Sequence, residues 1–261
     1  MAIRLVATDM DGTLLDSQKR QPADFMDWVK SHPEIKTVIA SGRQYYTLVN
    51  EFIPVKDQLI YVAENGGLVF EKGKVLYSNE MKKEDIRDCL NLMEGVKGLT
   101  PILCGAKSAY MKPASELVCR EASIYYHHLQ QTEDLYEASS QDVIVKIAVF
   151  VEEKAAEDSM KYFTQIKSHL TAVLSGDSWI DIANSTISKG IAVEVIQKKY
   201  GISKSESMAF GDYLNDADLL KSCEESYCMK NGHPDLKAIA KYIADSNDDN
   251  GVMKVLKSRI S

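Results

Sequence analysis

The sequence predicts an α/β protein whose core is a doubly wound, Rossmann-like parallel sheet, with an α+β module inserted into it. Short apolar runs rich in β-branched residues recur along the chain, and each stops at a polar or glycine-containing turn, as buried parallel strands do. Segments with helical apolar spacing follow most of these runs, which is typical of βαβ units. The pattern changes in residues 81–183, where strands mix with long amphipathic segments.

The length of 261 residues suits one large or two smaller domains. We expect a core built from residues 1–80 and 184–261, and an inserted module over residues 81–183. The formal net charge of -7 and a pI near 5.4 disfavour a nucleic-acid footprint and a polybasic membrane patch. An acidic protein that binds an anionic ligand needs local positive charge or a metal ion.

The five cysteines are scattered and form no C-x-x-C motif, which indicates reduced thiols rather than disulfides or a zinc site. The first apolar run is too short for a signal peptide, and no run approaches the roughly 20 residues of a membrane span. We therefore expect a soluble, cytoplasmic protein. The sequence does not predict its oligomeric state.

Residues 3–8 are the first predicted strand, and the string DMDGTLLD follows it at residues 9–16. Asp9 and Asp11 thus leave the carboxyl end of a strand, the edge of an open α/β sheet where ligands bind. Two nearby carboxylates repel. Either a hard cation such as Mg²⁺ lies with them, or one acid is a nucleophile and the other a proton donor. A helix cap followed by a turn at Gly12 is the alternative without a ligand.

A helix is predicted over residues 22–30, with Pro22 in its first turn, and a second strand over 37–40. Ser41, Gly42 and Arg43 follow that strand and precede a helix over residues 44–52. A hydroxyl and a glycine amide beside a helix N-terminus suit a phosphate cradle, although a serine N-cap explains Ser41 equally well. The next strand, residues 59–63, ends in Glu-Asn-Gly. There Asn65 is a candidate for the substrate entrance or a plain turn into the hairpin of residues 68–77.

The middle segment begins with an amphipathic helix that carries Ile86, Leu90 and Met93 at helical spacing. Strands are expected at 99–103, 109–111, 143–151 (alternating), 171–174 and 179–182, and helices within 116–129 and over 153–170. The last helix would bury a stripe that contains Met160, Phe163, Ile166 and Leu170. The pair His127 and His128 is a poor metal site, because adjacent side chains diverge on a helix and no ligand lies four residues on.

The last segment places a lysine, Lys189, at the start of a helix over 191–200 whose apolar stripe holds Ile191, Val195 and Ile196. A lysine is unfavourable in a first turn, so an anionic ligand would explain it, although a solvated lysine is common. A strand at 207–210 runs into the string GDYLND at residues 211–216, and another strand is expected at 225–229. His233 would be a turn residue before a proline-started helix, and residues 248–251 precede the final helix.

Four signatures now stand in order: DMDGTLLD, Ser41, Lys189 and GDYLND. In this order the chain resembles the haloacid dehalogenase-like hydrolases, and within them the Cof-type phosphatases, whose large cap lies between the second and third signatures. The resemblance covers essentially the whole chain. It implies that residues 81–183 cap the active site and select the substrate.

The resemblance also implies an activity. This is Mg²⁺-dependent hydrolysis of phosphate monoesters of small metabolites, such as sugar phosphates, through an aspartyl-phosphate on Asp9. Asp11 would protonate the leaving group and then deprotonate the attacking water. The metal would be held by Asp9, the backbone carbonyl of Asp11, and Asp212. The residues implied to contact phosphate or substrate are Met10, Ser41, Gly42, Lys189 and Asn215, and those implied to support the site are Asp216, Arg43 and Asn65.

Two other functions remain open at this stage. A sugar phosphomutase or phosphotransferase would use the same Asp9 but return the phosphoryl group to a sugar. A non-catalytic, receiver-like regulator that binds a phosphorylated ligand is disfavoured, since a receiver is a single small doubly wound unit and this chain has Asp11 and a large insertion.

Overall fold

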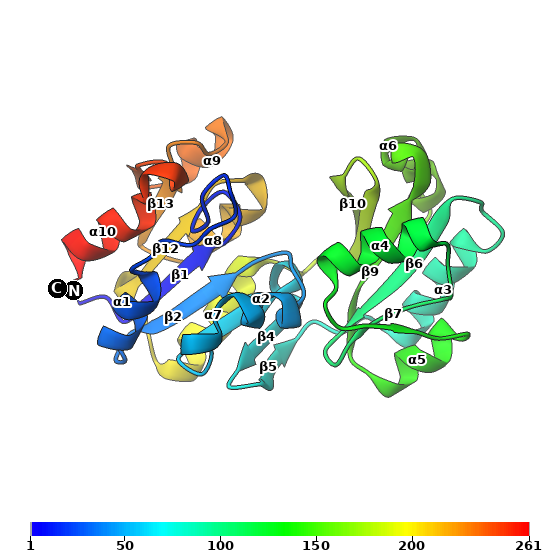
Figure 1. The fold of residues 1–261 in the computed structure, drawn as a ribbon, viewed down its shortest axis with the longest axis horizontal. Coiled ribbons are helices and arrows are strands. Elements are labelled where there is room, and N and C mark those ends of the chain that lie inside the picture. The colour runs from blue at the N-terminus through cyan, green and yellow to red at the C-terminus, as the bar shows by residue number, and fades with distance from the viewer. Residues whose placement is uncertain (1, 261) are drawn as a thin grey trace. The chain divides into compact units, whose positions relative to one another are not determined.

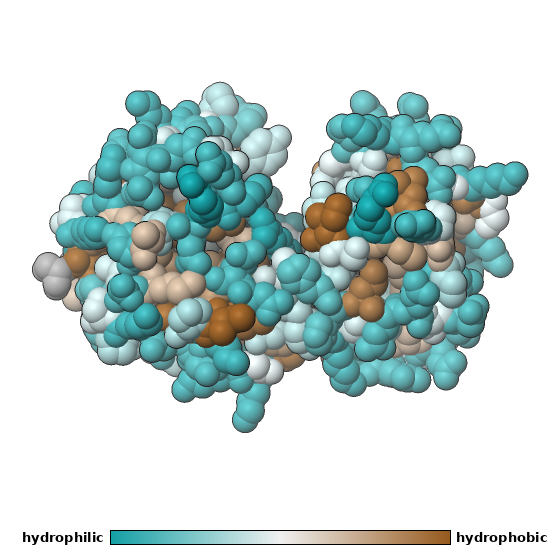
Figure 2. All heavy atoms as spheres, viewed as in Figure 1, coloured by the Kyte–Doolittle hydropathy of each residue, from teal (hydrophilic) through white to brown (hydrophobic). Residues whose placement is uncertain are grey.

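A computed structural model describes residues 2–260, which form two compact units. The first unit contains residues 2–77 and 188–260, and the second contains residues 78–187. Figure 1 shows the ribbon of both. In Figure 2 most of the visible surface of each unit is hydrophilic, as expected when the apolar runs of the sequence form the interior.

The sheet of the first unit has the strand order β14-β13-β12-β1-β2-β3-β4-β5. Neighbouring strands are parallel from β14 to β3, and β4 runs antiparallel to β3. The chain extends the sheet in one direction from β1 to β3 and in the other from β12 to β14. The order therefore reverses beside β1, and this switch point is where open α/β sheets bind ligands. The strands are β1 Leu5–Asp9, β2 Lys36–Ala40, β3 Leu59–Ala63, β4 Leu68–Glu71, β5 Lys74–Ser78, β12 Ser207–Gly211, β13 Glu225–Met229 and β14 Tyr242–Ala244.

Helices cover both faces of this sheet. One face packs against α7 (Lys189–Tyr200), α8 (Ala217–Lys221) and α9 (Pro234–Ile239), which join a single apolar cluster with β1, β2, β3 and β12. Side chains alternate along a strand, so Tyr61 of β3 and Phe70 of β4 point to the other face. There they meet Tyr45 of α2 (Tyr45–Glu51), and α1 (Phe25–Ser31) adds Phe25 against Phe52. The last helix, α10 (Gly251–Arg259), contacts β14.

The second unit is an α+β module with the strand order β10-β11-β9-β6-β7-β8. Its strand pairs are antiparallel except for β7 with β8. The strands are β6 Leu99–Gly105, β7 Ala109–Met111, β8 Leu129–Gln131, β9 Ile144–Val151, β10 Leu170–Gly176 and β11 Trp179–Asn184. The helices are α3 Lys83–Met93, α4 Glu116–Tyr125, α5 Leu135–Gln141 and α6 Ala156–Ser159. The predicted fold class, a doubly wound sheet with an additional α+β module, is confirmed.

The predicted helix over residues 153–170 is wrong. Helix α6 is one turn long, a 3-10 turn follows at Met160–Phe163, and β10 begins at Leu170. Long-range contacts override the helical spacing: Lys167 and His169 both bind the buried Asp85 of α3, at 2.7 Å each. Phe163 and Leu170 are nevertheless buried in the core of the unit. The apolar spacing therefore predicts correctly that these side chains are buried, but it does not predict the secondary structure of the segment.

Other predicted elements also differ from the structure because tertiary packing decides them. The alternation expected in 143–151 is wrong, because β9 is central and buried on both faces, with Lys146 paired to Asp181 at 3.2 Å. Ile191 is 39% exposed, because α7 packs on the sheet through Ala192, Val193 and Ile196 instead. Helix α1 begins at Phe25, so Pro22 precedes it. Short elements β8, α5 and β14 are absent from the sequence prediction.

Two predictions for the whole chain concern its cysteines and its membrane-spanning segments. The cysteines, which all lie within residues 2–260, are free thiols, and four of them are buried. Within the same residues, no helix has both the length and the apolar character needed to cross a membrane.

Candidate functional site

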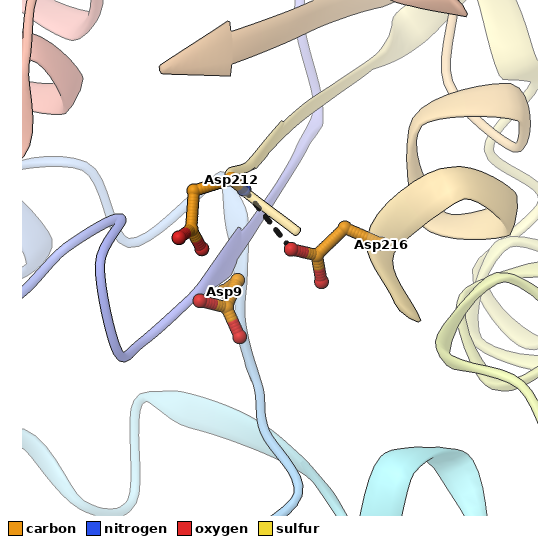
Figure 3. A group of neighbouring side chains, drawn as sticks. All are labelled: Asp9, Asp212 and Asp216. Carbon is orange, nitrogen blue, oxygen red and sulfur yellow. Dashed lines mark hydrogen bonds between the residues drawn. The ribbon is translucent and has the colours of Figure 1, made fainter. Parts of the chain in front are cut away.

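Three aspartates meet at the carboxyl edge of the first unit's sheet. Asp9 ends β1, Asp212 follows β12, and Asp216 lies in the same loop as Asp212 (Figure 3). One carboxylate oxygen from each lies within 4.8 Å of the others. Strands β1 and β12 are parallel neighbours, so their ends deliver these side chains to one place. In the part of the chain that the structure describes, no other group of histidine, cysteine or acidic side chains has this spacing, and the pair at 127–128 forms none.

The loop after β12 is folded by its own aspartate. One oxygen of Asp216 accepts hydrogen bonds from the backbone N–H groups of Asp212, at 3.0 Å, and Tyr213, at 3.2 Å. Thr13 donates to Asp212 at 3.0 Å from the turn after β1. A side chain at Gly12 would lie 2.4 Å from an oxygen of Asp212, and its φ is +82°, so this turn needs glycine. The strings DMDGTLLD and GDYLND thus hold the loop after β1 and the loop after β12 close together.

Lys189 lies inside this group rather than in solvent. Its ammonium donates to Asp9 and to Asp216, each at 2.7 Å, and its side chain is 1% exposed. Ser188 caps α7 by accepting a hydrogen bond from the N–H of Ile191. Gly66 has φ +105°, and a Cβ there would lie 2.2 Å from the carbonyl oxygen of Ser188. The solvated-lysine alternative is therefore wrong: the start of α7 is pressed against the turn after β3, and Lys189 is buried.

Burial dominates the electrostatics of the acidic group. It raises the pKa of Asp9 to about 8, against the attraction of Lys189 and with the repulsion of Asp216. The pKa of Asp212 is also raised, by burial and by Asp216. Burial opposes the charge of Lys189, but its two carboxylate partners hold its pKa above the ordinary value. Fully ionised, the three acids and one lysine have a net charge of -2, which favours a bound cation.

The donor set fits Mg²⁺, since all candidate ligand atoms are carboxylate oxygens and a hard divalent cation prefers oxygen. Asp9 and Asp212, both predicted as ligands, are in the group. Asp216, predicted as a supporting residue, is in it as well. The side chain of Asp11 is not, but the contact predicted for Asp11 is through its backbone carbonyl.

Asp11 has cationic partners of its own. Arg43 donates to both of its oxygens, at 2.8 and 2.6 Å, and Lys19 donates to one of them at 2.7 Å. Burial raises the pKa of Asp11, but the hydrogen bonds from Arg43 and Lys19 outweigh it, so that the pKa lies below its ordinary value. Arg43 is thus placed beside a candidate catalytic residue.

The remaining predicted residues lie on loops at the same edge. Ser41 is 2% exposed, and its hydroxyl accepts from the N–H of Arg43. The N-cap of α2 is Gln44, so the explanation of Ser41 as that cap is wrong. Asn215 donates to the side chain of Asn65 at 3.1 Å, and a Cβ at Gly42 would lie 3.0 Å from the same Asn65 amide. The turns after β2, β3 and β12 therefore meet at Asn65.

Met10 has a fully buried side chain, which leaves only its backbone available for a ligand. Sequence reasoning missed Lys19, and also Asn231, whose side chain donates to the carbonyl of Gly12 at 2.8 Å. Asn231 could have been found, because it follows β13 and so reaches the same sheet edge. Nothing local to residues 16–20 marks Lys19, which reaches Asp11 from a turn in which its φ is +62°.

Comparison with known proteins gives consistent matches over the full length. The family model for haloacid dehalogenase-like hydrolases matches residues 6–256. The 5-amino-6-(5-phospho-D-ribitylamino)uracil phosphatase YbjI of Escherichia coli (strain K12) is 31% identical over 261 residues, covering 98% of this chain and 96% of that protein. A putative phosphatase of Streptococcus pyogenes is 30% identical over 270 residues, covering 98% of both.

Solved structures agree. A crystal structure of a protein from Streptococcus mutans UA159 has a TM-score of 0.82 at 29% identity and covers 98% of both chains. A crystal structure from Thermotoga maritima has a TM-score of 0.88 at 20% identity, covering 99% of this chain and 98% of that one. At that identity the second likeness concerns the fold alone.

Proposed function

The chain belongs to the haloacid dehalogenase-like hydrolases and is a phosphatase, and on this premise we propose that it hydrolyses phosphate monoesters of small metabolites with Mg²⁺ through an aspartyl-phosphate on Asp9. The observation that best supports the proposal is the burial of Asp9 with Lys189 in a group of acids at the switch point of the sheet. A charge cluster of this kind is expensive to bury unless a ligand compensates it.

In the proposed reaction Asp9 attacks phosphorus in line. Lys189 binds one oxygen of Asp9, which fixes the carboxylate and leaves its second oxygen to act as the nucleophile. Asp9 and Asp212, with Asp216 beside them, would hold the metal ion. When bound, Mg²⁺ supplies positive charge that offsets the repulsion between the carboxylates and the phosphate. Asp216 anchors Lys189 from its other side and closes the loop that presents Asp212.

Asp11 then moves the proton. For the first half of the reaction it must take up a proton against the attraction of Arg43 and Lys19, and it then protonates the leaving alkoxide. In the second half its ionised carboxylate deprotonates the water that hydrolyses the phosphoenzyme. Ser41, the amide of Gly42 and Asn215 would bind the non-bridging phosphate oxygens from the turns after β2 and β12. Several catalytic and binding groups must act together because uncatalysed monoester hydrolysis is among the slowest known reactions, with enzymatic enhancements of up to about 10²¹-fold.

We further propose that the second unit acts as the cap that selects the substrate, and that the substrate is an ester of a sugar or sugar alcohol. The Escherichia coli relative is named for a phosphorylated ribityl compound, which supports this substrate class.

The test is a phosphate-release screen over a panel of phosphorylated metabolites, with Mg²⁺ and with a chelator. Wild type should release phosphate only with the metal, and Asp9→Asn should be inactive but folded. Asp27→Asn, a change in an exposed ion pair on α1, is the matched control and should behave as wild type. Full activity of the Asp9 variant would show that another residue is the nucleophile.

Two further measurements distinguish the proposed phosphatase mechanism from its alternatives. Beryllium fluoride should form its phosphoryl mimic on the Asp9 carboxylate, and a mimic on any other residue would contradict the scheme. Product analysis with a bisphosphorylated sugar distinguishes release of phosphate from its return to the sugar. Return to the sugar would identify a phosphomutase instead.

A further inference from the structure

The side-chain amides of Asn65 and Asn215 form a pair between the turn after β3 and the turn after β12. The proposed function uses Asn215 as a phosphate contact and does not use Asn65. We propose that Asn65 is a positioning residue, which holds the amino group of Asn215 toward the phosphate cradle formed by Ser41 and Gly42. The inference rests on the proposed function, in which Asn215 and this cradle bind the phosphate group.

Asn65 is fixed to the cradle through its backbone. Its N–H group donates to the carbonyl oxygen of Ser41 at 2.9 Å. The preceding N–H group, that of Glu64, donates to the carbonyl oxygen of Arg43 at 3.1 Å. Two backbone hydrogen bonds therefore join the turn after β3 to the turn after β2.

The turn that carries Asn65 has an unfavourable backbone conformation. Glu64, Asn65 and Gly66 are successive residues with positive φ, at +51°, +55° and +105°. Residues with a side chain adopt such angles rarely, although asparagine does so more readily than most, and they keep them only where the surroundings impose them. Here the surroundings are the two hydrogen bonds to the turn after β2 and the close packing of Gly66 on Ser188.

The side chain of Asn65 lies against the cradle and selects one orientation of Asn215. A Cβ at Gly42 would lie 3.0 Å from Nδ2 and 3.2 Å from Oδ1 of Asn65. The same Oδ1 accepts a hydrogen bond from Nδ2 of Asn215 at 3.1 Å. Only the amino end of an amide can donate, so the amino group of Asn215 is the end turned toward the Gly42 turn. This is the end that an anionic phosphate requires, and its second hydrogen atom remains for a phosphate oxygen.

The two asparagines differ in how firmly they are held. Asn215 is exposed, whereas Asn65 is half-buried and its backbone is bonded to the cradle. An exposed side chain loses rotational freedom when it binds a ligand, and this loss reduces affinity. The hydrogen bond to Asn65 restricts Asn215 before the ligand arrives. Asn65 therefore preorganises the phosphate contact that Asn215 makes.

The experiment is a double-mutant cycle of Asn65→Gly and Asn215→Ala. It measures the Kd of inorganic phosphate by calorimetry with Mg²⁺ present, and kcat/KM for p-nitrophenyl phosphate. Glycine adopts a φ of +55° without strain, so Asn65→Gly removes the amide and keeps the backbone conformation accessible. Asn250→Gly is the matched control. Asn250 is an exposed asparagine in the same unit with the same φ of +55°, and its side chain makes no capping hydrogen bond.

Positioning predicts that the effect of Asn65 depends on Asn215. The Kd of phosphate should rise about tenfold in Asn215→Ala, which loses a hydrogen bond to a charged group. It should rise about fivefold in Asn65→Gly, because phosphate must then immobilise Asn215 itself. In the Asn215→Ala background, Asn65→Gly should change the Kd by less than about twofold. The value of kcat/KM should follow the same pattern, and Asn250→Gly should behave as wild type.

Equal effects of Asn65→Gly in the two backgrounds would overturn the inference, because Asn65 would then act on phosphate without Asn215. Absence of any effect in the wild-type background would overturn it as well. The calorimetric Kd does not depend on the fraction of protein that is folded, so a partly folded variant still decides the matter.

The proposed function fails on a different observation. If Asp9→Asn retains turnover of p-nitrophenyl phosphate, the nucleophile is wrong, whereas the cycle of phosphate binding still tests the role of Asn65. If Asp9→Asn is inactive and the cycle is additive, the mechanism stands and the positioning role is wrong.

Discussion

Replacing Asp9 by asparagine should stabilise the metal-free protein at neutral and alkaline pH, although it removes the proposed nucleophile. Asp9 is 6% exposed and lies beside Asp212 and Asp216, with Lys189 as its ion-pair partner. Its negative charge is therefore unfavourable in the folded state without a metal ion. Asparagine has nearly the same shape and carries no charge, so it removes this cost.

The magnitude follows from the pKa. Burial raises the pKa of Asp9 from 3.8 to about 8. Because the folded protein binds this proton more tightly than the unfolded chain, the contribution of Asp9 to stability is full below about pH 4. It is lost progressively as the pH rises toward 8. At about 1.4 kcal/mol per pKa unit, wild type should lose up to about 4 kcal/mol relative to Asp9→Asn between about pH 5 and pH 8.

The assay is urea unfolding in a chelator across that pH range. The chain has two tryptophans, Trp28 in the first unit and Trp179 in the second. A Trp179→Phe background therefore lets Trp28 fluorescence report the unit that contains Asp9. Asp27→Asn in the same background controls for the chemical change, since it alters an exposed ion pair. Taking the difference between variants cancels the titration of the groups that do not interact with Asp9.

Wild type should lose stability with rising pH more steeply than Asp9→Asn, and Mg²⁺ at about pH 8 should stabilise wild type by binding only the folded state. If the two proteins show parallel pH profiles in the chelator, Asp9 is not buried at an electrostatic cost, and the reasoning about this site fails.

Three other changes test the structure around the site and in the second unit. Lys189→Met leaves two buried carboxylates without their shared ammonium and should lower the unfolding free energy by about 3–5 kcal/mol in urea at about pH 8. The loss should be smaller at about pH 5, where Asp9 binds a proton. Gly66→Ala forces a Cβ to 2.2 Å from a backbone oxygen and should destabilise the first unit by more than about 2 kcal/mol in thermal unfolding. In the second unit, burial raises the pKa of Asp85, but hydrogen bonds from Lys167 and His169 hold it below the ordinary value. Its stabilisation is therefore present above about pH 4 and lost below it. Unfolding of wild type and Asp85→Asn, followed by the tryptophan of the second unit, should converge as the pH falls.

The sequence identifies candidate site residues best where a polar residue directly follows a predicted strand. Asp9 and Asp212 each follow a short buried strand, and parallel neighbours bring such positions together without any knowledge of long-range contacts. Lys189 was identifiable from its unfavourable place in a first turn. Its burial between Asp9 and Asp216 was not, because it depends on the turn at Gly66 pressing against the start of α7.

Where the prediction failed, residues distant in the chain decided the outcome. The segment 153–170 has helical spacing, yet Lys167 and His169 are drawn to Asp85, more than 80 residues earlier. Lys19 was missed because a left-handed backbone at a lysine has no sequence signature. Propensity describes what a segment would do alone, and these contacts exist only after the units have folded.

The raised pKa of Asp9 also bears on the order of events at the site. With a pKa of about 8, Asp9 is mostly protonated at neutral pH when no cation is present, and a protonated carboxyl group is not a nucleophile. A cation held by these acids would favour the ionised form of Asp9. Under the proposed mechanism, Asp9 must therefore lose its proton before it attacks the phosphate, and a bound cation would favour that loss. The release of protons when Mg²⁺ is added to wild type at about pH 7, and a smaller release from Asp9→Asn, would be measurable by calorimetry in buffers of different ionisation enthalpy. Equal proton release from both proteins would show that Asp9 is already ionised before the metal binds.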